Sequence, residues 1–224
     1  MKKVIALFFI VQLSSFGFCQ TMTDAYAAEN IVWFGADFSK TKLIGEGFND
    51  PDKIIGDYFS KWNYRTIEYI SSRYDGKLGG KNLIIDITTS IARSEAVKVE
   101  DIISFNTLEK TLEIAETQGI VNLCNSPRNP TGIGVILISD YFEGRSNKAM
   151  YSVVYFNIEN KKILQVDKYV GQGSGFGLLP FWDKPLFYAV EKLQYKFKAD
   201  FTSYRFEQRK IQRQQKKAAK LNSK

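Results

Sequence analysis

Histidine is absent from this chain of 224 residues, and cysteine occurs only twice. Without histidine, the chain cannot form a histidine-containing catalytic triad, a histidine general base or a histidine-containing zinc site. One or two cysteines are also too few for a zinc site made of thiolates. Catalysis would have to use carboxylate, lysine, tyrosine or serine side chains, and a glycosidase stays open because it needs only two carboxylates. We expect a protein that is not an enzyme, with no cofactor and no metal.

Long hydrophobic runs are also scarce, and the one that stands out lies at the N-terminus. Two lysines precede residues 4–18, which are mostly apolar and carry no charge. Gly17 and Cys19 place small residues at the −3 and −1 positions before Gln20. This pattern predicts a signal peptide over residues 1–19, which is too short to span a membrane. We therefore expect an exported protein without a transmembrane span, in the periplasm or associated with the outer membrane, and without a nucleic-acid partner.

Two other interpretations of the N-terminus compete with cleavage before Gln20. Ala25 and Ala27 form an A-x-A cleavage frame, but it lies farther from the apolar run. Cys19 would become a lipidated N-terminus if a small residue preceded it, whereas Phe18 is large. Cleavage before Gln20 without lipidation is the favoured interpretation.

The second cysteine bears on disulfide bonding. Loss of Cys19 with the signal peptide leaves Cys124 alone, so that no internal disulfide can form. A thiolate nucleophile needs a nearby base or positive charge. We expect Cys124 to be a small, half-buried apolar side chain instead.

Positive charge is concentrated at the C-terminal end. The whole chain has a formal net charge of +7, but residues 196–224 carry +8 and residues 20–195 carry −3. The tail, residues 198–224, is therefore expected to be a basic C-terminal segment that is helical or disordered. Such a tail can attach the protein to an envelope protein or to an anionic surface such as lipid headgroups or lipopolysaccharide. A solvated tail without a partner is the alternative.

Hydrophobic patterns predict strands that alternate with helices. Segments rich in apolar or β-branched residues predict strands at residues 31–38, 83–91, 133–139, 151–157 and 162–170, the last two forming a hairpin. Helical spacing and caps predict helices from residue 51 onward, at residues 107–118 and at residues 181–195. This order predicts the α/β (α+β) class, with a single layered domain over residues 28–197 in which helices pack on one mixed β-sheet.

Local signals fix the expected ends of some elements. The segment Asn49-Asp50-Pro51 is expected to supply a helix cap and a first-turn proline. Thr107 is expected to cap the second helix and Gly119 to end it. Asn160 is expected to take the left-handed position of the hairpin turn. Residues 64–80 fit either a strand or a continuation of the first helix.

A glycine-rich loop at residues 171–177 supplies the binding candidates. These are Gly173, Gly175, Phe176, Gly177 and Trp182. Backbone amides in such a loop can bind an anion at the N-terminus of the following helix. The spacing is not G-x-G-x-x-G and no G-K-[ST] follows, so close packing of the loop is the simpler interpretation. Phe176 and Trp182 flank loop positions and are the aromatic residues expected to be exposed.

Acidic residues in or near predicted strand ends are the alternative site. They are Asp37, Asp86, Asp140 and Glu143. Two converging carboxylates would be able to hydrolyse a glycan or to hold calcium. Surface solvation, strand-end hydrogen bonding and helix capping are the structural alternatives. The sequence does not show that any two of them meet, so no catalytic or metal-binding residue is assigned.

Residues 132–193 carry motifs that resemble an uncharacterised family of exported bacterial proteins. The matching segments are Phe156-Asn157-Ile158, Lys161-Lys162-Ile163-Leu164, Gly173 to Gly177, and Phe181-Trp182. The family pattern is a strand ending in a D-I-x-x-K-K-V-L hairpin, a G-x-G-G-F-G loop and a helix that begins with aromatic residues. Asn157 stands where the pattern has aspartate, and the long basic tail is a second departure.

The layout of the elements is also similar, more loosely, to small α/β domains of envelope lipoproteins in the curli-secretion and penicillin-binding-protein-activator groups. Those domains are assembly and regulatory parts, so the resemblance implies a non-catalytic role. We therefore expect a non-catalytic binding or assembly module of the cell envelope. A carboxylate-based hydrolase of cell-wall or dietary glycan is the alternative, and a small-ligand carrier is a third hypothesis. The ligand, the partner and the oligomeric state stay open.

Overall fold

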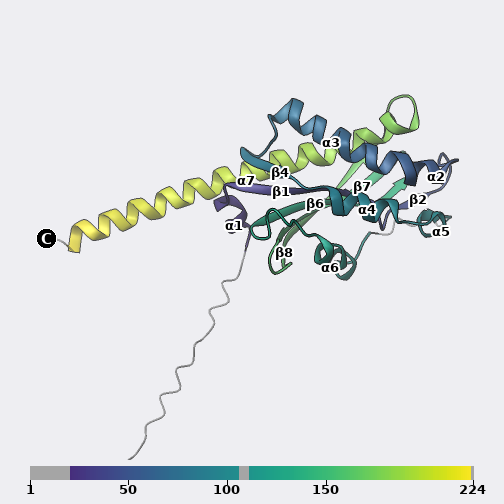
Figure 1. Ribbon diagram of the computed structural model, residues 1–224. Helices are drawn as coiled ribbons and strands as arrows, with labels where there is room; N and C mark the ends of the chain where they lie inside the picture. The colour runs from purple at the N-terminus through teal and green to yellow at the C-terminus, as the bar shows by residue number, and fades with distance from the viewer. Residues whose placement is uncertain (1–20, 106–110, 223–224) are drawn as a thin grey trace, which may run out of the picture.

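The computed structural model describes residues 21–105 and 111–222 and shows a mixed α/β fold with helices packed against one β-sheet (Figure 1). The predicted fold class is confirmed. The strands are β1 (Asn30–Asp37), β2 (Lys42–Ile44), β3 (Lys77–Leu78), β4 (Lys81–Ile85), β5 (Ile103–Ser104), β6 (Ile133–Glu143), β7 (Lys148–Asn157) and β8 (Ile163–Gln172). The helical segments are α1 (Met22–Ala27), α2 (Pro51–Lys53), the π-helical turn η1 (Ile54–Tyr58), α3 (Phe59–Tyr74), α4 (Thr88–Glu95), α5 (Val99–Ile102), α6 (Ile114–Leu123) and α7 (Leu178–Asn222).

The sheet is parallel on one side and antiparallel on the other. β1 pairs in parallel with β4 and with β6, while β6, β7 and β8 pair antiparallel in that order. β2 continues along the edge of β6 where β1 has ended, because β1 pairs as far as Ile138 and β2 pairs from Tyr141 onward. The loop between β1 and β2 therefore opens in the middle of the sheet, at the carboxyl end of β1.

Both faces of the sheet are buried. On one face, helices α1, α3 and α7 pack over a core that includes Trp33, Leu137 and Tyr151. On the other face, α6 packs over a core that includes Phe34 and Val154. β1, β6 and β7 are buried along almost their whole length, which explains why their sequences are apolar without alternation. Among the described strands β8 pairs only with β7, and it is partly exposed.

Several predicted elements are confirmed. β1, β6, β7 and β8 coincide with or contain the strands expected there. Asp50 caps α2, since its carboxylate accepts a hydrogen bond from the Lys53 backbone N–H (3.1 Å), and Pro51 opens the first turn. Residues 64–74 continue α3, which settles the choice between strand and helix there.

The strand predicted at residues 83–91 is wrong in its second half. β4 ends at Ile85, and α4 begins at Thr88. Ser94 of α4 is buried, and its hydroxyl accepts a hydrogen bond from the Phe38 backbone N–H (3.0 Å). This contact with the chain after β1 fixes α4 in place, so tertiary packing overrides the β propensity of the Thr and Ile residues.

The helix predicted at residues 107–118 is misplaced, and Thr107 lies outside the described residues. α6 begins instead at a capping box in which Glu113 and Glu116 bond reciprocally. Gly119 lies inside α6 and does not end it. The signal missed in the sequence was the pair of glutamates three residues apart.

The hairpin turn between β7 and β8 differs from the prediction in one residue. Lys161, with φ of 60°, takes the left-handed position in place of Asn160. Asn160 Oδ1 accepts a hydrogen bond from the Lys162 backbone N–H (3.0 Å), and Asn157 Oδ1 accepts one from the Asn160 N–H (2.9 Å). The two asparagine side chains thus hold the turn, and the left-handed residue is the next one along.

The last helix is far longer than predicted. α7 has 45 residues and includes both the expected helix at 181–195 and the described part of the basic tail. At 1.5 Å per residue its length is about 68 Å. Figure 1 shows α7 crossing the sheet and extending well beyond the other elements.

Candidate functional site

The predicted strand-end carboxylate Asp37 is buried in an ion pair. Arg93 Nε of α4 lies 2.8 Å from Asp37 Oδ2. Asp37 Oδ1 accepts hydrogen bonds from the backbone N–H (2.9 Å) and the hydroxyl (2.5 Å) of Ser39. Arg93 also donates to Ser39 Oγ (2.7 Å). These contacts fasten the loop after β1 to α4, which is a structural role.

Asp140 of β6 is held by three contacts of its own. Its carboxylate accepts hydrogen bonds from the Leu112 backbone N–H (3.0 Å) and the Ser152 hydroxyl (2.9 Å), and Lys168 Nζ lies 3.7 Å away. Burial raises the pKa of Asp140, and the contacts with Leu112, Ser152 and Lys168 oppose that rise. Asp140 therefore connects the segment before α6 to β7 and β8.

The other two candidate carboxylates have different surroundings. Asp86 follows β4, is partly exposed, and its backbone N–H donates to the Trp33 carbonyl oxygen (2.9 Å). Glu143, at the end of β6, accepts a hydrogen bond from the Ser146 hydroxyl in the turn to β7. The contacts of Asp37, Asp140 and Glu143 are thus structural, and the hydrolase alternative gains no support from them.

A cavity of about 760 Å³ lies beyond the carboxyl end of β1, bordered by α4 and α6. Ligands of open α/β sheets bind at such a place. Its charged lining residues are Lys40, Lys42, Arg93, Asp101, Glu116 and Asp140. Arg93 is paired with Asp37, and Lys42 donates to the Asp101 carbonyl oxygen. Because positive and negative groups balance, the lining does not select a ligand by charge.

The glycine-rich loop joins β8 to α7 and allows them to pack closely. The Gly173 backbone N–H donates to the Asn147 carbonyl oxygen (2.6 Å), and any side chain on Gly173 would overlap the Phe181 ring. A Cβ atom on Gly171 would lie 2.5 Å from Pro185 Cα. The first part of the loop is therefore a packing element.

The second part of the loop is open. Gly175 and Gly177 have φ angles of 113° and 83°, and a Cβ on Gly175 would meet nothing within 4 Å. Phe176 between them is 98% exposed. Trp182 is buried instead, with its ring 5.6 Å from that of Phe48, so its expected exposure is wrong. Of the two aromatic candidates, only Phe176 is available to a partner.

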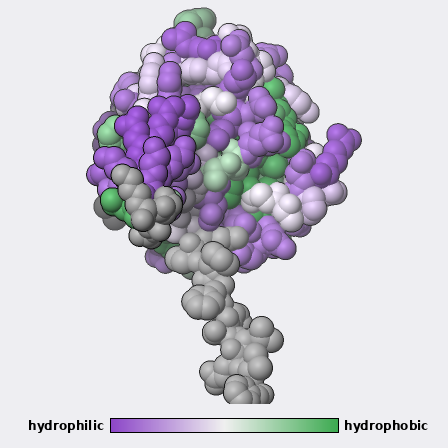
Figure 2. Space-filling view, turned by 90° about the vertical axis from the view of Figure 1, so that its left-hand side faces the viewer, coloured by the Kyte–Doolittle hydropathy of each residue, from purple (hydrophilic) through white to green (hydrophobic). Residues whose placement is uncertain are grey.

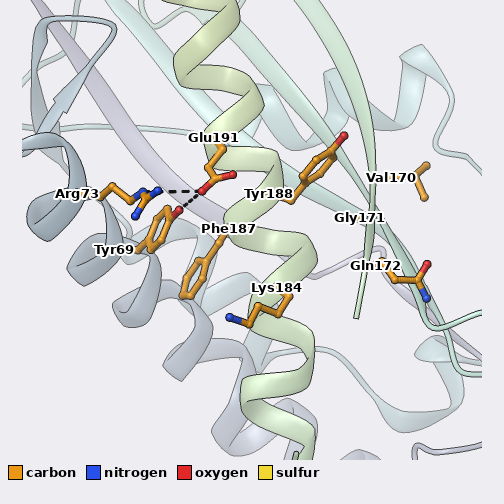
Figure 3. Close-up of a pocket in the computed structure, with 9 residues that line it drawn as sticks. All are labelled: Tyr69, Arg73, Val170, Gly171, Gln172, Lys184, Phe187, Tyr188 and Glu191. Atoms are coloured by element: carbon orange, nitrogen blue, oxygen red, sulfur yellow. Dashed lines mark hydrogen bonds and ion pairs between the residues drawn. The ribbon is translucent and has the colours of Figure 1, made fainter. Parts of the chain in front are cut away.

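A groove of about 630 Å³ runs beside α7 between α3 and the end of β8 (Figure 3). Tyr69 of α3 stacks on Phe187 of α7 with ring centroids 4.2 Å apart, and its hydroxyl donates to Glu191. Arg73 Nε lies 3.9 Å from the same carboxylate. Burial, followed by the contact with Glu191, raises the pKa of Tyr69. Figure 3 shows these side chains converging between the two helices, so the groove follows a packed seam.

Helix α1 marks the place where α7 leaves the body of the molecule. The Tyr26 ring contacts the rings of Phe197, Phe201 and Tyr204, with centroids 5.3, 6.5 and 5.7 Å away. Phe197 is buried and Tyr204 is half-buried, whereas almost all side chains after Tyr204 are exposed. We call residues 205–222 the basic arm.

The basic arm carries seven cations and one carboxylate, Glu207. The cations, all exposed, are Arg205, Arg209, Lys210, Arg213, Lys216, Lys217 and Lys220. Each residue of an α-helix advances by about 100°, so these seven lie within an arc of about 140° around the axis. Tyr204, Ile211 and Ala218 lie on the opposite side. Figure 2 views the molecule from the side toward which α7 projects, and the nearest part of the helix is strongly hydrophilic.

An aromatic residue lies among these cations. Phe206 is 66% exposed. It borders a groove of about 380 Å³ whose other lining residues are Arg209, Lys210, Arg213, Gln214 and Lys217. The sequence prediction used only the net charge of the tail. The spacing of the cations by three and four residues was the signal that could have predicted this one-sided surface.

The described residues also bear on membranes, metals and thiol chemistry. Within residues 21–105 and 111–222, no helix is long and apolar enough to cross a membrane. The same residues hold no group of three or more His, Cys, Asp or Glu that could bind a metal ion. Burial raises the pKa of the Cys124 thiol to about 12, and its Sγ donates to the Ile120 carbonyl oxygen (3.5 Å). Cys124 is therefore an unreactive side chain, and it is more deeply buried than the half-buried position expected from the sequence.

Comparisons with known proteins assign no function. No protein-family model and no curated protein matches the chain. Among solved structures, the chain is similar to the hypothetical protein CT253 from Chlamydia trachomatis, at 11% sequence identity and a TM-score of 0.29. That alignment covers 79% of this chain and 98% of CT253. A likeness this weak carries no argument, so the fold and the candidate site rest on the geometry of this chain.

Proposed function

We propose that the protein is a non-catalytic binding or assembly module of the cell envelope, and that the basic arm is its contact element. The observation that carries this proposal is the arm itself, in which seven exposed cations share one side of a helix that extends beyond the packed body. A partner with negative charge complements this surface. The body holds the arm in place, and its carboxylates Asp37 and Asp140 make structural contacts.

The attachment of the arm favours an assembly role over that of a loose tether. α7 is continuous from Leu178 to Asn222, and its first part is fixed to the sheet by Leu186, Val190 and Leu193. The arm therefore leaves the body in a defined direction. A partner bound to the arm would be held in a set orientation relative to the sheet.

Fractionation of cells that produce the full chain tests this proposal. In an arm variant, glutamine replaces Arg209, Lys210, Arg213 and Lys217, and we expect it to shift from the envelope fraction to the soluble exported fraction. A body variant is the matched control. It loses the same charge by replacing the exposed lysines Lys40, Lys77, Lys98 and Lys148 with glutamine, and it should stay with the envelope. Equal distribution of the arm variant and the wild type would contradict the proposal.

A further inference from the structure

We infer that the partner of the basic arm is a lipid bilayer that contains anionic phospholipid. This inference rests on the proposed function and names the surface that the same site would contact. It is drawn from the distribution of charge on the arm, the position of Phe206 and the place at which α1 meets α7.

The cations form a strip that suits a flat surface. From Arg205 to Lys220 the helix rises by about 22 Å, and the seven cations stay within one arc of about 140° along that length. Lysine and arginine side chains are long enough to reach a common plane from both borders of such an arc. Glu207 lies outside the arc, so a plane that touches the cations meets no carboxylate of the arm.

The spacing of the cations also favours negative charge nearby. Arg205, Arg209, Arg213 and Lys217 follow one another at intervals of four residues. Like charges at this spacing are neighbours on a helix and destabilise it. Phosphate groups along the strip would remove that repulsion, so the helix of the arm should become more stable when it is bound.

Phe206 distinguishes a bilayer from other anionic partners. Its side chain is 66% exposed, and Arg209, Lys210, Arg213 and Lys217 surround the groove beside it. In a bilayer, cations meet the headgroup phosphates while an aromatic ring enters the boundary between headgroups and acyl chains. An acidic protein surface offers the charge without a continuous apolar layer beneath it. The predicted signal peptide disfavours nucleic acid.

The fold brings the N-terminal helix to the base of the arm. Tyr26 of α1 packs on Phe201 and Tyr204, the last contacts before the arm begins. The segment that follows the predicted signal peptide therefore reaches the body beside the arm. A membrane that held the precursor by its N-terminus would lie at the same end of the molecule.

Vesicle co-sedimentation of the purified protein tests the inference. We expect the wild type to bind vesicles of phosphatidylglycerol mixed with phosphatidylcholine, and not vesicles of phosphatidylcholine alone. The arm variant lacks four cations and should bind roughly 600-fold more weakly, since each cation near an anionic surface contributes roughly fivefold. The body variant should bind like the wild type. Binding of the wild type should be lost at about 1 M salt, where the Debye length is about 3 Å.

A substitution at Phe206 tests the apolar part of the contact. Trp33, Trp62 and Trp182 are buried, so a tryptophan introduced by Phe206→Trp would dominate any change of fluorescence on vesicle binding. We expect its emission to shift to shorter wavelength with phosphatidylglycerol vesicles. Binding without a shift would overturn the placement of Phe206 in the bilayer interface.

The outcomes separate this inference from the proposed function. Equal vesicle binding by the arm and body variants would overturn the bilayer as partner of the arm. No vesicle binding by the wild type, together with arm-dependent retention in the envelope, would also overturn it while leaving the proposed function intact. Displacement from vesicles by polyglutamate at equal charge, together with no emission shift of the Phe206→Trp protein on vesicles, would assign the arm to an acidic protein and overturn the bilayer. If the arm variant stays in the envelope, the proposed function itself fails.

Discussion

The two parts of α7 differ in nearly every respect except secondary structure. Residues 178–204 lie on the sheet, where Leu186, Val190 and Leu193 are buried. Residues 205–222, the basic arm, lie beyond the body, and the side chains of residues 205–221 are exposed except that of Gln208, which is partly exposed. The packed part is held by tertiary contacts, whereas the arm depends on helix propagation and on good helix formers such as glutamine, lysine, arginine and alanine.

Charge follows the same division. In the packed part, Asp183 pairs with Arg65 of α3 at 2.5 Å, and Lys196 pairs with Asp167 of β8 at 2.6 Å. In the arm, cations have cations as neighbours at four-residue spacing. The packed part thus uses its charges to join elements of the protein, while the arm presents its charges outward. Substitutions should therefore change stability in the first part and binding in the second.

A buried charge should separate the body from the arm most strongly. Val154 lies at the centre of β7 and is fully buried. Val154→Asp would place an unpaired carboxylate between the sheet and α6, and we expect a loss of about 5 kcal/mol or more, enough to prevent folding. Ile211→Asp on the exposed arm should leave the unfolding free energy unchanged within about 0.5 kcal/mol. A soluble Val154→Asp protein that unfolds in urea like the wild type would contradict this difference between the body and the arm.

Removal of one partner of a buried ion pair should give the next largest effect. Arg93→Met leaves Asp37 buried without its cation, and we expect the unfolding free energy to fall by about 3 kcal/mol. Adding Asp37→Asn should recover part of that loss. Arg213→Met on the arm is the matched control and should cost less than about 0.5 kcal/mol. Urea titrations of all four proteins measure these differences, and an unaffected Arg93→Met protein would show that the pair is dispensable.

Two glycines of the loop before α7 should differ in how much a substitution costs. Gly171→Ala would force a Cβ against the backbone of Pro185, so we expect a loss of about 2 kcal/mol. Gly175→Ala meets no atom but must adopt a φ of 113°, which should cost about 1 kcal/mol. The melting temperature of the Gly171→Ala protein should therefore be lower than that of the Gly175→Ala protein. The reverse order would mean that the open part of the loop carries the packing.

Truncation should show where the packed part of α7 ends. A stop after Phe206 keeps the contacts of Tyr26 with Phe201 and Tyr204 and should leave the melting temperature unchanged. A stop after Lys198 removes those contacts and should cost about 1 kcal/mol. The domain boundary expected from the sequence, residue 197, implies instead that a stop after Lys198 leaves stability nearly unchanged. Equal melting temperatures for the two truncated proteins would show that the folded domain ends near residue 197, as the sequence predicts.

Continuous apolar runs made the sheet predictable. The segments around residues 31–38 and 151–157 have no polar face, and such segments fit strands that are covered on both sides. Segments with mixed signals were harder. The run at 83–91 is rich in β-branched residues, yet a contact between Ser94 and Phe38 fixes its second half as the start of a helix. A contact 56 positions away in the sequence leaves no trace in local propensity.

The candidate site was predictable only in outline. Net charge predicted a basic tail, but the one-sided arrangement depends on the tail being a helix continuous with α7. The partners of the strand-end carboxylates could not be predicted, because Arg93 and Lys168 are far from Asp37 and Asp140 in the sequence. The exposure of Trp182 was wrong because its helical position faces Phe48. Pairings of this kind follow from topology, which a single sequence does not display.

The position of β1 in the sheet sets the order in which the chain can fold. β1 lies between β4 and β6, and its pairing of Ile31 with Ile133 joins positions about 100 residues apart, so this contact forms only after a large loop has closed. The docking of Tyr26 on Tyr204 joins positions about 180 residues apart. A chain delivered from its N-terminus must therefore keep its first strand unpaired on one side until β6 arrives. Its first helix stays undocked until nearly the whole chain is present.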